Sequence, residues 1–202
     1  MIESHLILAL AWIAFCILHS VLAAAGVKQY MEKQLGRYFF MYRLCYTSFA
    51  LFSFAAIIIY EACMATFYLF IPIPLVLPAG LACCFAGAMI MARCMYKYFL
   101  RFTGLRTAFG NHDEKVLFTD GLNRYVRHPL YAGTLLFIWG AFIAMPYASL
   151  FVSNCILTVY TLVGIRFEEK KLVQEFGAAY TNYKKKVPMI IPTFGTQLPA
   201  RL

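Results

Sequence analysis

The chain has 202 residues, of which 62% are hydrophobic and only 13% are charged, and its net charge is +9. Charged residues are about half as frequent as in ordinary soluble domains, so polar side chains are too few to cover a soluble fold. The composition excludes a soluble globular protein and predicts one membrane domain over residues 1–202, with its excess apolar surface facing lipid.

Apolar runs long enough for membrane helices predict an all-α, polytopic bundle of about five transmembrane helices. The runs cover residues 6–25, 38–60, 75–96, 131–145 and 149–165. The last two would reach only about 22–25 Å, against roughly 30 Å of hydrocarbon. They are therefore expected to form a hairpin that barely crosses, or does not fully cross, the bilayer.

Residues 1–100 are thus expected to hold three transmembrane helices. Residues 101–202 are expected to hold a polar loop, the hairpin and an interfacial C-terminal helix. The third run is rich in small residues, among them Gly80 and Gly87. Small residues allow helix backbones to approach closely inside a membrane, so this run is expected to pack tightly on a neighbour.

The 18 Lys and Arg residues follow this topology. Four lie between positions 28 and 43, seven between 93 and 127, and seven between 166 and 201, all on one side of the predicted spans. The positive-inside rule assigns that side to the cytoplasm, which puts the N-terminus outside. Cations that follow topology, without a recognisable binding motif, argue against nucleic acid as a partner and favour the lipid bilayer.

The seven cysteines lie in or beside apolar runs, with no CxxC pair and no Cys/His spacing typical of zinc. They are interpreted as small packing residues, and no metal site is predicted.

Two polar segments flank the predicted hairpin. In the first, Arg127 and His128 precede Pro129, which is tolerated in the first turn of a helix. An arginine fork and free helix N–H groups suit a carboxylate or phosphate. The alternative is that these side chains only anchor the helix at the membrane interface.

The second segment is expected to form one helical stripe that continues the fifth run. The stripe consists of Ile165, Glu169, Leu172, Phe176, Tyr180, Tyr183 and Val187. A carboxylate at the membrane end of an apolar stripe needs a partner, and Arg127, His128 or a polar ligand would serve for Glu169. The alternative is an exposed acidic pair, Glu168 and Glu169, with local links to lysines.

Because the hairpin returns the chain to its starting side, the two segments are expected to lie close together. They would form a site for a polar ligand with anionic and cationic ends. The residues by themselves indicate this site but no reaction.

The two segments together match a known pattern. The first reads T-x-G-x-x-R-x-x-RHP-x-Y-x-G from Thr119 to Gly133, and the second reads EE-x-x-L-x-x-x-FG-x-x-Y-x-x-Y from Glu168 to Tyr183. The chain here resembles the membrane methyltransferase superfamily that includes isoprenylcysteine carboxyl methyltransferases and phospholipid N-methyltransferases. The stretch around His19 is similar to bacterial members of the NnrU and methanethiol S-methyltransferase types, which favours a bacterial inner membrane.

The resemblance implies an enzyme that uses S-adenosylmethionine as methyl donor. The sequence agrees with this, because it has no dinucleotide-binding GxGxxG motif after a strand. The cofactor contacts that it implies are Arg127, His128, Tyr131, Gly133, Glu168, Glu169 and Tyr180. Arg127, His128 and Glu169 are the residues expected to matter for catalysis. The methyl acceptor would be lipophilic or small: an isoprenylcysteine carboxylate, a phospholipid amine or a thiol.

Some alternatives remain open at this point. His19 is either an acceptor contact or a packed, hydrogen-bonded histidine. Four polar-loop residues either help to close the site or are simply solvated: Arg101, Arg106, Asn111 and His112. For the whole chain, the rival functions are an NADPH-dependent, steroid-reductase-like membrane reductase and a non-catalytic membrane protein.

Overall fold

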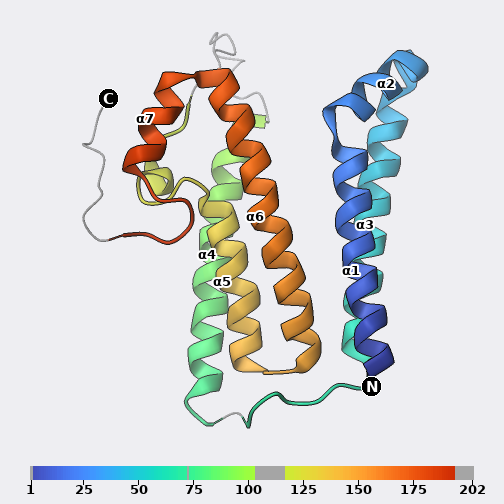
Figure 1. Cartoon of the computed structure of the whole chain (residues 1–202), viewed down its shortest axis with the longest axis vertical. Helices are drawn as coiled ribbons and strands as arrows, with labels where there is room; N and C mark the ends of the chain where they lie inside the picture. Colours follow the sequence, from blue (N-terminus) through green and yellow to red (C-terminus); the bar gives the residue numbers. More distant parts are fainter. Residues whose placement is uncertain (1, 72, 103–116, 194–202) are drawn as a thin grey trace. The chain divides into compact units, whose positions relative to one another are not determined.

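The computed structural model describes residues 2–71, 73–102 and 117–193, with backbone only for residues 97–102. Its helices in chain order are α1 (Ile2–Ala23), α2 (Ala25–Leu35), η1 (Gly36–Tyr38), α3 (Phe39–Cys63), α4 (Val76–Phe102), η3 (Gly121–Arg124), α5 (Pro129–Ala144), α6 (Ala148–Phe176) and α7 (Ala178–Lys186) (Figure 1). Within these ranges there is no strand, only an isolated bridge between Tyr68 and Tyr147. The prediction of an all-α fold is confirmed.

Four helical stretches in the described residues are long and apolar enough to cross a membrane. They are 2–23, 25–63, 76–96 and 148–176, and α5 is a shorter apolar helix of 16 residues. The predicted membrane helix bundle is therefore confirmed. The segment between the first two runs, for which no structure was predicted from the sequence, forms the separate helix α2.

The C-terminal helices agree with the prediction in one respect and differ in another. As expected, the helix of the fifth run continues beyond its apolar part, and α6 extends without a break for 29 residues, since good helix formers follow that part. The stripe from Ile165 to Val187 was expected to lie on one helix. This expectation is wrong, because Gly177 adopts a φ of +54° and separates α6 from α7. With ψ at −124°, this is a backbone conformation that glycine adopts far more readily than other residues.

The chain forms two compact units. The first consists of Met1–Ile71 and Pro146–Tyr160, so it includes α1, α2, α3 and the beginning of α6. Leu8, Trp12 and Ile57 form its buried apolar core. The Trp12 indole N–H donates to Ser153 Oγ at 2.8 Å, and Ser153 donates to Glu61 at 3.0 Å. These hydrogen bonds satisfy the polar groups of Trp12, Ser153 and Glu61, which would otherwise cost free energy in apolar surroundings.

The second unit consists of Pro72–Met145 and Thr161–Leu202. Helices α4 and α5 lie side by side in it, and glycines bring their backbones together (Figure 1). A Cβ atom on Gly140 would lie 2.8 Å from Cys83 Cβ, and one on Gly87 would lie 2.6 Å from the Gly133 carbonyl oxygen. The expectation that the third run packs tightly is met at this contact.

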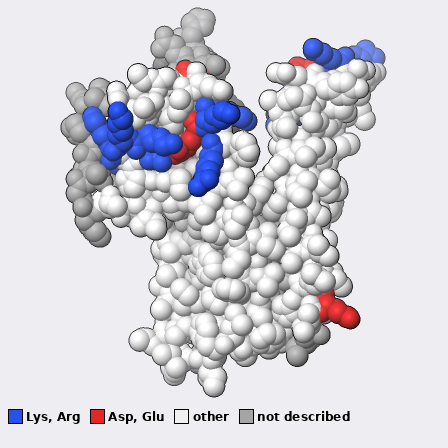
Figure 2. All heavy atoms as spheres, in the orientation of Figure 1, with Lys and Arg blue, Asp and Glu red and all other residues white. Residues whose placement is uncertain are grey.

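Cations gather at one end of the second unit. Exposed lysines and arginines follow the apolar part of α6, which ends at Ile165, and continue on α7 (Figure 2). They are Arg166, Lys170, Lys171, Lys184, Lys185 and Lys186. The candidate site lies in this polar region, outside the apolar part of α6.

Candidate functional site

The start of α5 fixes the position of Arg127 and His128. Pro129 occupies the first turn of α5, where its missing N–H costs nothing, and His128 is the residue that caps the helix. The backbone N–H of Arg127 donates to the Pro188 carbonyl at 2.9 Å, and that of His128 donates to the Met189 carbonyl at 3.1 Å. The chain after α7 therefore runs beside the start of α5.

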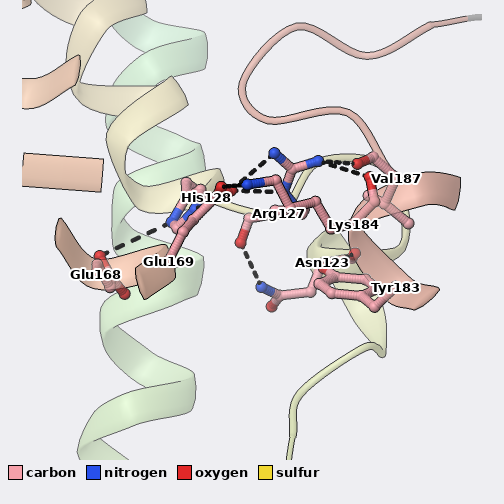
Figure 3. A network of polar contacts seen from close by, with 8 residues as sticks. All are labelled: Asn123, Arg127, His128, Glu168, Glu169, Tyr183, Lys184 and Val187. Atoms are coloured by element: carbon pink, nitrogen blue, oxygen red, sulfur yellow. Dashed lines mark hydrogen bonds and ion pairs between the residues drawn. The ribbon is translucent and has the colours of Figure 1, made fainter. Parts of the chain in front are cut away.

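Glu169 on α6 is the centre of a buried polar network (Figure 3). Its Oε1 accepts hydrogen bonds from Arg127 Nε at 2.8 Å and Nη2 at 2.7 Å, and it lies 3.3 Å from His128 Nε2. Its Oε2 lies 2.6 Å from Lys184 Nζ on α7. The side chains of Arg127, His128 and Glu169 are only 8%, 4% and 7% exposed, so these charged contacts are largely shielded from water.

Arg127 also holds the C-terminal end of α7. Its Nη1 donates to the carbonyls of Lys184, at 3.0 Å, and Val187. Cations stabilise the free carbonyls at a helix C-terminus. All three guanidinium nitrogens of Arg127 therefore donate to protein acceptors, and the side chain links the loop, α6 and α7.

The network perturbs two titratable groups. Burial by itself raises the pKa of the Glu169 carboxyl, but the hydrogen bonds from Lys184 and Arg127 outweigh it and hold the pKa at about 2, below the ordinary 4.5. Burial and the nearby Glu169 carboxylate raise the pKa of the Tyr180 phenol. At neutral pH Glu169 is ionised and Tyr180 keeps its proton.

A cavity of about 390 Å³ lies next to this network. That volume is in the range of small-molecule sites. Its lining is formed by Leu117, Phe118, Asn123, Arg127, His128, Pro129, Leu130, Tyr131, Glu168, Leu172, Phe176, Tyr180 and Tyr183. Tyr180 is 1% exposed, and its hydroxyl has no hydrogen-bond partner among the described residues. A buried hydroxyl without a partner costs free energy, so this atom indicates where a ligand would bind.

The structure brings most of the predicted site residues together. The cavity is lined by five of them: Arg127, His128, Tyr131, Glu168 and Tyr180. Glu169 does not line the cavity, but its carboxylate contacts the side chains of Arg127 and His128. Glu168 is 45% exposed and its Oε2 lies 3.8 Å from His128 Nδ1.

Gly133 is the exception, because it lies in the contact between α4 and α5. A Cβ atom there would be 2.9 Å from the Ile90 side chain. Of the polar-loop residues proposed to close the site, Arg106, Asn111, His112 and the side chain of Arg101 lie outside the described residues.

Three residues of the site were not predicted as site residues from the sequence. Lys184 pairs with Glu169, Tyr183 donates to the Asn123 carbonyl at 2.6 Å, and the Asn123 amide donates to the Arg127 carbonyl at 3.2 Å. Lys184 lies among three consecutive lysines, and only the fold distinguishes it from its neighbours.

His19 belongs to the first unit. The hydroxyl of Tyr46 lies 3.2 Å from His19 Nε2, and the His19 ring stacks on Phe15. This is the environment of a packed, hydrogen-bonded histidine, and a contact with an acceptor stays a prediction.

A family model described as phospholipid methyltransferase matches residues 75–179. This is more than half of the chain. The chain belongs to the phospholipid methyltransferase family. The matched region runs from α4 through α6 and includes Arg127, His128, Glu168 and Glu169, whereas Tyr180 and Lys184 follow it.

The alignments with curated relatives each cover less than half of this chain. Methanethiol S-methyltransferase of Crocosphaera subtropica is 40% identical over 97 residues, which are 46% of this chain and 37% of the relative. Methanethiol S-methyltransferase 2 of Bradyrhizobium diazoefficiens is 43% identical over 94 residues, 44% of this chain and 36% of the relative.

Protein-S-isoprenylcysteine O-methyltransferase of Schizosaccharomyces pombe is 38% identical over 84 residues, 40% of this chain and 35% of the relative. The matches thus span little more than a third of each of these relatives. No solved structure shows significant similarity to the chain.

Proposed function

We propose that this protein transfers a methyl group from S-adenosylmethionine to a small or lipophilic acceptor at the cytoplasmic face of the membrane. One observation carries the proposal: a cavity is lined by His128 and Glu168, which belong to the region that matches the family, and by the buried Tyr180, which directly follows it. Polar groups converging on a cavity with aromatic and aliphatic walls are typical of a small-molecule site.

The residues fit the methyl donor. The half-exposed carboxylate of Glu168 suits an ammonium group, and the buried Tyr180 hydroxyl is a donor that lacks an acceptor. Aromatic and apolar residues of the lining, among them Phe118, Tyr131 and Phe176, suit an adenine ring. We assign Arg127 and Glu169 the role of holding these walls together, because their charged groups already bond to each other and to α7.

The sulfonium of S-adenosylmethionine, when bound, supplies a methyl group that is already activated for displacement. The chain's own task is then to align the acceptor, exclude water and leave the acceptor atom unprotonated. Alignment of reacting groups can contribute up to about 7–11 kcal/mol. We assign His128 the role of accepting the acceptor's proton, since its imidazole lines the cavity beside two carboxylates.

The apolar helices and the relatives support a small or lipophilic acceptor. Relatives are named for methanethiol and for protein S-isoprenylcysteine, which are respectively a small thiol and a lipid-modified carboxylate. An acceptor of either kind partitions into or through lipid. The one-sided distribution of cations supports an orientation with the C-terminus and the cavity on the cytoplasmic side. The bacterial relatives favour the inner membrane as the location.

The proposal is tested on the purified, detergent-solubilised protein. Labelled S-adenosylmethionine should be retained and NADPH should not. Methyl transfer is then assayed with methanethiol, an isoprenylated cysteine analogue and phosphatidylethanolamine vesicles. We expect transfer to one of these acceptors, with loss of transfer in His128→Ala. Retention of NADPH instead would support a reductase, and retention of neither would support a non-catalytic protein; both results overturn the proposal.

A further inference from the structure

Helix α7 forms one wall of the cavity, and two kinds of contact hold it: Tyr180 and Tyr183 pack against Leu172 and Phe176 of α6, and polar contacts hold its C-terminal end. It carries Tyr180 and Tyr183, which line the cavity and are 1% and 5% exposed. The preceding residue Gly177 links α7 to α6 with a left-handed backbone conformation, and a Cβ atom there would meet nothing within 4 Å. The link itself therefore provides no packing that would hold α7 in place.

The C-terminal end of α7 is held by the network around Glu169 (Figure 3). Arg127 contributes from one side through the carbonyls of Lys184 and Val187. The Lys184 side chain contributes from the other, with its Nζ 2.6 Å from Glu169 Oε2. Glu169 Oε1 is already engaged by Arg127 and faces His128, so Lys184 is the cation at the second oxygen.

The burial of the two partners is unequal. The Glu169 side chain is 7% exposed, whereas that of Lys184 is 47% exposed. Loss of Lys184 would leave a buried carboxylate oxygen without this cation, which costs far more than the loss of a surface ion pair. Neighbouring Lys185 and Lys186 are also exposed, but neither takes part in the contacts of Glu169 described above.

We propose that Lys184 is a positioning residue: by pairing with Glu169 it holds α7, and with it Tyr180 and Tyr183, as the wall of the ligand cavity. The inference rests on the proposed function for the identity of the ligand. It assigns Lys184 no contact with the ligand, since Lys184 does not belong to the cavity lining.

The pair has a consequence for pH dependence. The groups facing Glu169 are Arg127 and His128 at the start of α5, its neighbour Glu168, and Lys184 and Tyr180 on α7. Removing Lys184 takes away a hydrogen bond that lowers the pKa of Glu169 while its burial, which raises this pKa, remains. Glu169 then becomes protonated at a higher pH and pairs less well with Arg127.

The test uses the full-length protein with S-adenosylmethionine as probe. In Lys184→Met, the Kd for the probe should rise roughly tenfold. Relative to wild type, it should rise further as the pH is lowered below about 5, because Arg127 still lowers the pKa of Glu169 in the variant. Lys184→Arg should restore most of the affinity and the flatter pH profile. Lys185→Met, the matched control on the same helix, should bind as wild type does.

If Lys184→Met binds with wild-type affinity and an unchanged pH profile, the proposal is overturned. A measurement on the wild-type protein covers the case in which the variant does not fold. Lys184 should react more slowly with an amine-labelling reagent than Lys185 and Lys186, as read by peptide mass spectrometry, and equal rates would contradict the pairing. If wild-type protein fails to bind the probe while Lys184 is protected, the proposed function fails and the pairing stands.

Discussion

The adjacent residues Glu168 and Glu169 allow a sharp test of the site, because the structure gives them different roles. Glu169 is buried and bonded to cations from two other segments, whereas Glu168 is half-exposed and lines the cavity. Replacing each by Gln keeps the side-chain size and removes the negative charge. We expect Glu169→Gln to destabilise the protein and Glu168→Gln mainly to weaken binding of S-adenosylmethionine.

The magnitudes follow from burial. Glu169→Gln leaves Arg127, whose side chain is 8% exposed, without its counterion. Breaking a buried ion pair costs about 3–5 kcal/mol. At about 2–4 °C per kcal/mol, the unfolding temperature should fall by about 6–20 °C. The Glu168 contact with His128 is 3.8 Å long and its carboxylate is 45% exposed, so its loss should cost about 0–1 kcal/mol.

The pH dependence provides an internal check. The pKa of Glu169 is held at about 2, below its ordinary 4.5, so its stabilising contribution is complete above about 4.5 and is lost as the pH falls toward 2. The difference in unfolding temperature between wild type and Glu169→Gln should therefore be constant above about pH 5 and shrink below it. Thermal unfolding in detergent, followed by intrinsic fluorescence, measures both effects.

Equal unfolding temperatures for wild type and Glu169→Gln would refute the structural role of the pair. A larger loss of stability in Glu168→Gln than in Glu169→Gln would also refute it, because burial would then not decide the cost.

Three further predictions concern other features of the second unit. Tyr180→Phe should change the unfolding temperature little, because its hydroxyl makes no well-formed hydrogen bond and only the nearby Glu169 carboxylate is affected, and it should raise the Kd for S-adenosylmethionine by about 2–10-fold. An unchanged Kd would show that no ligand atom uses this hydroxyl. Gly177→Ala should cost about 1–3 kcal/mol in stability, because a φ of +54° with a ψ of −124° is accessible to glycine and strained for alanine. Equal stability of Gly177→Ala and wild type would argue against this backbone conformation. Gly140→Ala should cost about 1–3 kcal/mol in stability, because the new Cβ would lie 2.8 Å from Cys83 Cβ. The control Gly164→Ala should be neutral or stabilising, because nothing lies within 4 Å of a Cβ at that position. Thermal unfolding compares the two variants, and a neutral Gly140→Ala would contradict the close contact of α4 and α5.

The candidate site shows which relations can be read from spacing. The RHP and EE segments flank two apolar runs, and a helical hairpin must return the chain to its starting side. The expected convergence is met, since Arg127 and Glu169 are hydrogen-bonded although the hairpin separates them in sequence. The pattern left open whether Glu169 pairs with Arg127 and His128 or with a ligand, and it did not indicate that Glu168 and not Glu169 would line the cavity. That difference depends on the rotation of α6 about its axis.

Composition and periodicity by themselves determined that this is a membrane helix bundle, which runs are apolar and where the cations lie. These properties depend on residues close to one another in the chain, because the free energy of placing an apolar or charged segment in lipid or in water depends on that segment's own residues. Only the tertiary structure decided that Gly177 divides the last helical stripe, that Lys184 and not Lys185 meets Glu169, and that Gly133 packs against α4. Each of these depends on which distant side chains share the same space, and a single sequence does not record that proximity.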